Sequence, residues 1–262
     1  MRFAILLVLM TFSALGNDTL VIEGLKTGKE EIKYLDWQKK YSEFRIQLMV
    51  DDHPNYEKKI KYEGVRFYDF LASKGHKITK DDLIIITCTD GYRPLLKGGY
   101  FLDKKAVLAY KEVEPKGRVS QDKRWTKVKM EDEYVTPGHY YLIWPSQKGH
   151  KHSWPYQIQK IEIKKESEFN ELLEITPKDK TALQGFKVFK SKCLKCHSIK
   201  YTGPKGKAPD LAYVTGYRTD HYIRNRIRKG RGKMPPFSKA LISDEEIEQV
   251  LSYLKEIYSD TK

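Results

Sequence analysis

Two cysteines and a histidine near the end of the chain stand at a spacing that can do covalent chemistry. They are Cys193, Cys196 and His197, in the pattern Cys-x-x-Cys-His. Thiols three residues apart can add to the two vinyl groups of one haem, and the next histidine is then held beneath the iron. A zinc site would need two further ligands, and a redox dithiol would need a βαβ setting. The pattern therefore predicts one covalent haem c, with His197 as an axial ligand.

A sixth iron ligand is expected from the residues that follow. Met234 lies 37 residues after His197, in the loop Gly-Lys-Met-Pro-Pro-Phe, an interval usual for a small cytochrome. His221 is the rival ligand, but it starts an Arg-rich helix and is expected to face solvent or a haem propionate. Histidine–methionine ligation raises the reduction potential and closes both axial positions. This favours electron transfer over catalysis at the iron.

Helices are expected on both sides of the haem pattern. Thr176 as N-cap and Pro177 at the first helical position predict a helix that ends at the cysteines. Ser243 with Glu246 three residues later forms a capping box, and apolar residues follow at helical spacing. The haem would therefore lie between a helix before it and a helix at the end of the chain.

Residues 177–258 resemble a class I cytochrome c. The matching segments are Gly185–Phe189, Cys193–His197, Ala208–Leu211, Met234–Pro235 and Tyr253–Leu254. The resemblance implies a compact all-α domain in which the carbonyl of Pro209 accepts a hydrogen bond from the ring of His197 and fixes it. It also implies that the first and last helices cross, with Gly185 against the region of Leu251–Leu254.

The first residues have the pattern of a secretory signal peptide. Arg2 is followed by the apolar run Phe3–Met10 and by small residues up to Gly16. The apolar run is shorter than the ~20 residues that cross a bilayer, and no later segment is long and apolar enough. We expect residues 1–16 to be removed and the mature protein to be periplasmic, without a transmembrane segment.

The chain is strongly basic, with a net charge of +14, and much of the excess lies in residues 177–262. Six residues before Met234 form what we call the basic cluster: Arg224, Arg226, Arg228, Lys229, Arg231 and Lys233. In class I cytochromes the haem edge emerges near this loop, so the cluster would steer an acidic redox protein partner. A solvated helix face is the alternative. Export argues against a nucleic-acid partner, and contact with anionic lipid headgroups stays open.

Residues 17–165 are predicted to form an α+β, β-rich domain. Runs of β-branched and aromatic residues predict strands at Thr19–Glu23, Phe44–Val50, Leu83–Thr89, Tyr140–Trp144 and Tyr156–Ile163. Val65–Lys74 has helical spacing, and Asp90 in Asp-Gly-Tyr is expected to make a turn. Residues 166–176 are predicted to be a linker, although the charged stretch Lys164–Glu174 could also form a connecting helix, and residues 177–262 are predicted to be the all-α domain.

Several segments of the first domain resemble the sulfite-oxidase (molybdopterin-binding) fold. They are Tyr62–Leu71, Thr89–Tyr92, Ala106–Tyr110 and Tyr141–Pro145. Members that bind molybdenum use a cysteine thiolate before the helix that follows Gly64-Val65, and the stretch Tyr41–Glu63 of this chain contains no cysteine. Cys88 follows that helix, and we interpret it as a small buried core residue. The resemblance therefore implies a relative without molybdopterin, used as a docking or recognition module.

Three other interpretations stay open. His150 and His152 alternate along the chain, so on a strand they could share a metal, although an exposed loop is the competing interpretation. An oxidoreductase that passes electrons from a molybdenum or other metal centre to its own haem is the alternative to an electron carrier. A haem-based gas sensor would need an open iron site.

Overall fold

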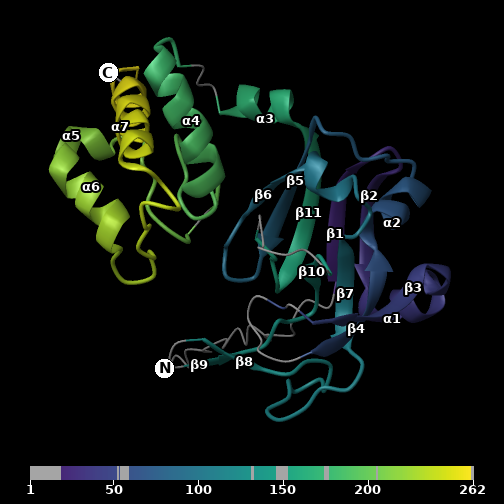
Figure 1. Cartoon of the computed structure of the whole chain (residues 1–262). Helices are drawn as coiled ribbons and strands as arrows, with labels where there is room; N and C mark the ends of the chain where they lie inside the picture. Colours follow the sequence, from purple (N-terminus) through teal and green to yellow (C-terminus); the bar gives the residue numbers. More distant parts are fainter. Residues whose placement is uncertain are drawn as a thin grey trace, which may run out of the picture.

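The computed structural model describes residues 19–51, 53, 59–130, 133–145, 153–173, 177–204 and 206–260. Strands dominate the first part of the chain and helices the last part, as the sequence predicts (Figure 1). The expected signal peptide and the pair His150 and His152 lie outside the described residues. Among the described helices, none has the length and apolar character needed to span a membrane.

The first part contains two sheets. The five-stranded sheet has the order β2 (Gly28–Lys33), β1 (Thr19–Leu25), β11 (Ile158–Lys165), β5 (Asp82–Cys88) and β6 (Leu95–Lys97). The four-stranded sheet has the order β10 (Tyr141–Ile143), β7 (Val107–Glu112), β4 (Ile60–Arg66) and β3 (Arg45–Val50), and β8 (Val128–Met130) pairs with β9 (Glu133–Val135). Only the pair β1 and β11 is parallel among these described strands. Side chains of both large sheets share one hydrophobic core.

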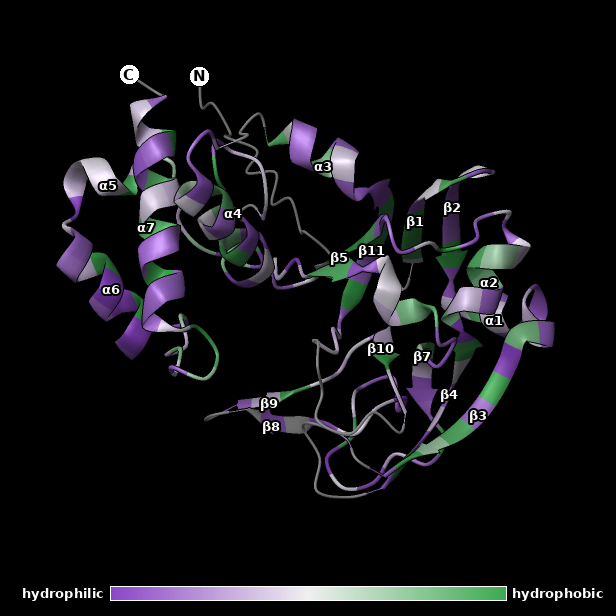
Figure 2. Cartoon of the chain, turned by 45° about the horizontal axis from the view of Figure 1, so that its top comes forward, coloured by the Kyte–Doolittle hydropathy of each residue, from purple (hydrophilic) through white to green (hydrophobic). Residues whose placement is uncertain are grey.

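Strand β5 is apolar at consecutive positions because both of its faces are buried (Figure 2). Ile84 and Ile86 belong to the core between the two sheets. Leu83 and Ile85 belong to a second core, which they share with the C-terminal helices. Since alternate residues of a strand point to opposite faces, β5 connects the two cores of the chain.

The helix predicted over Val65–Lys74 is shorter than expected. Val65 and Arg66 are the last residues of β4, because Val65 pairs with Arg45 on one side and with Leu108 on the other. Pairing in the sheet thus overrides the helical spacing at this point. The other short helices of this part are α1 (Tyr34–Lys39), η1 (Ser42–Phe44), α2 (Phe67–Ser73) and η2 (Gly98–Phe101).

The predicted linker begins with a packed helix, α3 (Glu166–Leu172). Phe169 and Leu173 are buried in the second core together with residues of β5. Lys190, which lies in the next helix, donates to the carboxylate of Glu166 at 2.5 Å and thereby ties the two helices together. Residues 174–176 lie outside the described residues, so the helix-capping role predicted for Thr176 does too.

The C-terminal part contains α4 (Lys180–Lys192), α5 (Val214–Tyr217), α6 (Asp220–Lys229) and α7 (Asp244–Ser259). The predicted cap of α7 is confirmed: the Ser243 hydroxyl accepts from the N–H of Glu246 at 3.0 Å, and the Glu246 carboxylate accepts from the N–H of Ser243 at 2.7 Å. The start of α4 was predicted too early. Asp179 is its N-cap and accepts from the N–H of Ala182 at 2.9 Å, a position that carboxylates favour.

Helices α4 and α7 lie side by side (Figure 1), and the backbone of α7 closely approaches Gly185 of α4. A Cβ at this position would lie 1.8 Å from the carbonyl oxygen of Gln249. This backbone contact falls two residues before the expected region Leu251–Leu254, whereas the rings of Phe186 and Phe189 meet Tyr253 within it, at 5.4 and 5.2 Å between centroids. Only glycine permits so close an approach.

Gly185→Ala should destabilise the helical part although alanine is the better helix former. Alanine gains up to about 1 kcal/mol in helix propensity, but the overlap with Gln249 costs about 3 kcal/mol because a packed crossing cannot relax freely. We expect a net loss of about 2 kcal/mol in urea unfolding followed by circular dichroism. Gly99→Ala is the control, because a Cβ there meets nothing within 4 Å. Equal unfolding midpoints for the two variants would contradict the packing argument.

Candidate functional site

The end of α4 carries the two cysteines and the histidine on one tight turn, Cys193–His197, which we call the attachment segment. The N–H of Cys193 bonds the carbonyl of Phe189 at 2.8 Å and closes the helix. The N–H groups of Cys196 and His197 then both bond the carbonyl of Cys193, at 3.1 and 2.9 Å. These bonds therefore hold the three chemically active side chains on one short segment.

The thiols of the attachment segment have the wrong environment for a redox dithiol. Cys193 and Cys196 are free, and burial raises the pKa of Cys193 to about 12 and also raises the pKa of Cys196. Redox-active cysteines need a lowered thiol pKa. Within the described ranges, no three His, Cys, Asp or Glu side chains are grouped as a metal site, so the zinc alternative finds no further ligands there.

The ring of His197 is oriented for a metal on its outer nitrogen. Its Nδ1 lies 2.8 Å from the carbonyl oxygen of Pro209, the contact that the resemblance implied. Because a carbonyl can only accept, Nδ1 carries the proton and Nε2 keeps its lone pair. Burial lowers the pKa of His197, which favours the neutral imidazole that binds metals. The two thiols and this ring are the donor set that a covalent haem requires.

Asp210 fixes the loop that presents the Pro209 carbonyl. Its carboxylate accepts from the Ser198 hydroxyl and from the N–H of Tyr201, both at 2.8 Å, and from the N–H of Ala212 at 2.9 Å. These bonds join the residues after His197 to the residues around Pro209. The sequence argument missed this role of Asp210, whose only local signal is the tendency of aspartate to accept from backbone N–H groups in turns.

Met234 lies in a loop closed by its own backbone. Its N–H and carbonyl bond Arg231 at 3.1 and 3.0 Å, and the side chain is half-buried against the second core. Gly230 ends α6 with φ +65°, and a Cβ there would lie 2.4 Å from the Met234 carbonyl oxygen. The rival His221 is exposed on α6, where the side-chain amide of Asn225 donates to its ring at 2.8 Å. Of the two candidate ligands, Met234 is thus the less exposed.

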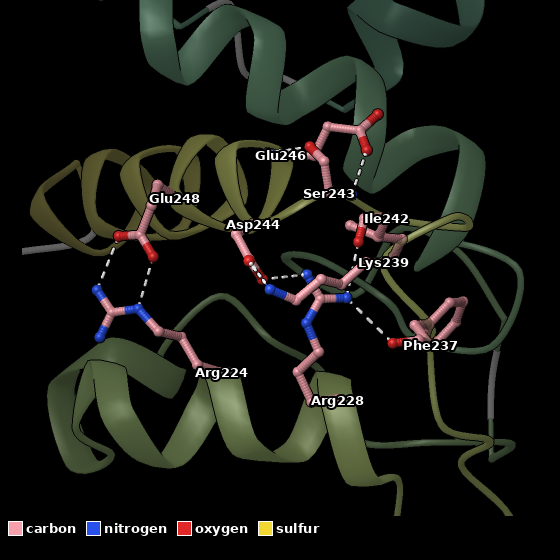
Figure 3. A network of polar contacts seen from close by, with 9 residues as sticks. All are labelled: Arg224, Arg228, Phe237, Lys239, Ile242, Ser243, Asp244, Glu246 and Glu248. Carbon is pink, nitrogen blue, oxygen red and sulfur yellow. Dashed lines mark hydrogen bonds and ion pairs between the residues drawn. The ribbon is translucent and has the colours of Figure 1, made fainter.

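Two members of the basic cluster have a structural role (Figure 3). Arg224 donates to both carboxylate oxygens of Glu248 at 2.6 and 2.7 Å. Arg228 pairs with Asp244 at 2.6 Å and also donates to two backbone carbonyls of the loop before α7. These bonds join α6 to α7, and each arginine is paired with a carboxylate of α7.

The other four members of the cluster, Arg226, Lys229, Arg231 and Lys233, form no ion pair within the described part of the chain. The guanidinium of Arg226 lies 4.8 Å from the centre of the Tyr222 ring. Lys229, Arg231 and Lys233 are exposed and lead from the end of α6 to Met234. Figure 2 shows the hydrophilic character of this helix. The free positive charge is thus concentrated next to the Met234 loop.

Cys88 and Asp90 lie together at the end of β5. Cys88 is buried, as interpreted from the sequence, and burial raises its pKa to about 12. The predicted turn is present: Asp90 accepts from the N–H of Tyr92 at 2.9 Å, and Gly91 takes φ +80°. A buried neutral thiol in a hydrophobic core behaves as a packing residue.

Comparisons with known proteins find matches to the helical part of the chain. The family model described as cytochrome c oxidase, cbb3-type, subunit III matches residues 180–254. Cytochrome c-551 of Bacillus subtilis (strain 168) is 34% identical over 76 residues, which are 29% of this chain and 63% of that relative. The chain thus matches less than two thirds of that relative's length. Residues 180–254 are therefore similar to c-type cytochrome domains, a kind of domain that binds haem c and transfers electrons.

Proposed function

Starting from the cytochrome domain, we propose that the chain is a periplasmic monohaem cytochrome that carries single electrons between redox partners. The observation that carries this proposal is the 2.8 Å contact between Nδ1 of His197 and the Pro209 carbonyl, directly after two free thiols. When bound, haem c supplies reversible one-electron transfer at its iron. Cys193 and Cys196 would hold it covalently, and His197 and Met234 would occupy both axial positions. Closed axial positions keep substrates away from the iron.

The first domain is proposed as a docking or recognition module, of residues 17–165, with a sulfite-oxidase-like fold. Its support is the resemblance of short segments in β4, β7 and β10 and at the turn after β5. Cys88 is buried and neutral, and it follows the helix before which molybdenum-binding members carry their cysteine. This supports a domain without molybdopterin. The acidic redox partner and the periplasmic location belong to the same proposal.

Elemental analysis of the mature, exported protein tests the proposed function. One iron per chain, without a second transition metal, is the expected result. One iron together with a stoichiometric second metal would instead favour an oxidoreductase that passes substrate electrons to its own haem. A chain without iron would contradict both.

The free part of the basic cluster should control the rate at which small charged reagents exchange electrons with the haem. Changing Lys229, Arg231 and Lys233 to glutamate should slow oxidation of the reduced protein by ferricyanide by about tenfold at low salt, because positive charge near a redox site concentrates anions. Cationic tris(phenanthroline)cobalt(III) should react faster. Both effects should shrink as salt screens the charges.

The matched control carries glutamate at Lys178, Lys180 and Lys187. Lys178 precedes α4, Lys180 and Lys187 lie in it, and all three are exposed, so the net charge changes equally while the residues from Lys229 to Met234 are unchanged. Equal rates for the two triple variants would mean that only net charge matters and that the cluster does not mark the electron-exchange site.

A further inference from the structure

The turn that joins β5 to β6 is a rigid element of the first domain. The N–H of Cys88 bonds the carbonyl of Tyr92, and the N–H of Gly91 bonds the carbonyl of Cys88, both at 3.0 Å. Arg93 forms an ion pair of 3.0 Å with Glu162 of the neighbouring strand β11. We call residues 88–93 the docking turn, because the side that faces away from the first domain contacts the cytochrome domain.

The docking turn is bonded to the attachment segment itself. The N–H of Arg93 donates to the carbonyl of Lys195 at 2.9 Å. The ammonium of Lys195 donates to the Ser153 hydroxyl at 3.2 Å, and that hydroxyl lies 3.0 Å from the Tyr92 hydroxyl. Lys195 is the second residue between the two cysteines, so the first domain contacts the very turn that would hold the haem.

Apolar packing continues the contact below these bonds. Leu83 and Ile85 on the outer face of β5 share the second core with Leu194, and the partly buried Leu95 of β6 and Cys193 pack against it. A shared core and a direct backbone bond fix two domains more firmly than surface ion pairs alone would, because exposed pairs contribute little. The docking turn therefore has a defined position beside the attachment segment.

An ion pair across this contact places opposite charges beside the docking turn. Lys207 of the cytochrome domain pairs with Asp90 of the docking turn. The docking turn that carries Asp90 also carries Arg93, whose N–H bonds the Lys195 carbonyl of the attachment segment. Both charges therefore lie on the contact between the docking turn and the domain that would hold the haem.

We propose that the first domain is a built-in partner of the cytochrome domain and that Asp90 is a positioning residue that lowers the reduction potential of the haem by offsetting Lys207. A carboxylate near a haem favours the more positively charged ferric state, and an unpaired ammonium favours the ferrous state. Because the contact is partly buried, salt screens it less than it screens the basic cluster. The inference rests on the proposed haem at Cys193 and Cys196.

The test is the midpoint potential of the full chain, measured by optical titration of the haem. Asp90→Asn leaves Lys207 unbalanced and should raise the potential, with an increase of up to about tenfold in the equilibrium constant for reduction, or about 59 mV for one electron. Lys207→Gln leaves Asp90 unbalanced and should lower the potential. The double variant should return close to the wild-type value.

The control is the ion pair of Lys29 with Glu31, 2.6 Å long, on β2 at the opposite edge of the sheet. Glu31→Asn and Lys29→Gln make the same charge changes far from the docking turn and should leave the potential unchanged. Shifts of the Asp90 and Lys207 variants that equal the controls, or that share one sign, would overturn the inference while leaving a haem-loaded cytochrome. A chain that carries no covalent haem would overturn the proposed function and this inference together.

Discussion

Replacement of both Cys193 and Cys196 by serine should abolish covalent haem attachment in cells that attach haem to exported cytochromes. A serine hydroxyl does not form the thioether bond, and among the described residues the only other thiol, Cys88, is buried in the first core. The measurement is haem staining of the chain after denaturing electrophoresis, together with the pyridine haemochrome spectrum. Staining should fall from one haem per chain to none.

The single variants distinguish the loss of a thioether bond from the loss of the folded domain. Cys193→Ser or Cys196→Ser leaves one thioether bond and one vinyl group, so the chain should still stain while its haemochrome band shifts. Cys88→Ser is the matched control and should keep both the staining and the wild-type band. Loss of covalent haem in Cys88→Ser, or its retention in the double variant, would contradict the assignment of the attachment segment.

Five of the eleven described strands follow from local sequence. The five predicted runs correspond to β1, β3, β5, β10 and β11, because β-branched and aromatic residues fit a pleated, half-buried surface. The consecutive apolar residues of β5 also indicate burial on both faces. They do not indicate what covers each face, and here one face meets the other sheet while the other meets the cytochrome domain.

The errors of prediction arise where distant residues decide. Val65 is in a strand because it pairs with Arg45 and Leu108, which lie 20 and 43 positions away in the chain. Residues 166–172 of the predicted linker form a helix, because Phe169 and Leu173 pack in a core against β5. No local pattern contains these contacts, so periodicity alone placed Val65 and Arg66 in a helix and left the charged stretch open between a linker and a connecting helix.

The candidate site was predictable to the extent that its chemistry is local. Cys193, Cys196 and His197 are adjacent and carry a covalent pattern that needs no knowledge of the fold. The division of the basic cluster could not be foreseen, because Glu248 and Asp244 come from another helix. The same holds for Asp90, which reaches Lys207 across 117 positions.

Met234→Ala should lower the reduction potential and open the iron to added ligands. Thioether ligation raises the potential of a histidine-ligated haem, and axial ligands set potentials over a range of about 0.8 V, so the loss should be on the order of 0.1 V. The absorption band that reports sulfur bound to iron should disappear. Carbon monoxide should then bind the reduced variant at neutral pH, whereas the wild-type chain should bind it poorly.

Two controls distinguish loss of a ligand from loss of structure. Met49→Ala removes a methionine that is 52% exposed on β3 of the first domain, and it should change neither the band nor the potential. His221→Ala removes the rival ligand and should also leave both unchanged, because His221 is exposed and bonded to Asn225. If instead His221→Ala abolished the native haem spectrum while Met234→Ala retained it, the sixth ligand would be the histidine. The loop closed by Gly230 and Arg231 would then have to position α6 and not the iron-binding sulfur.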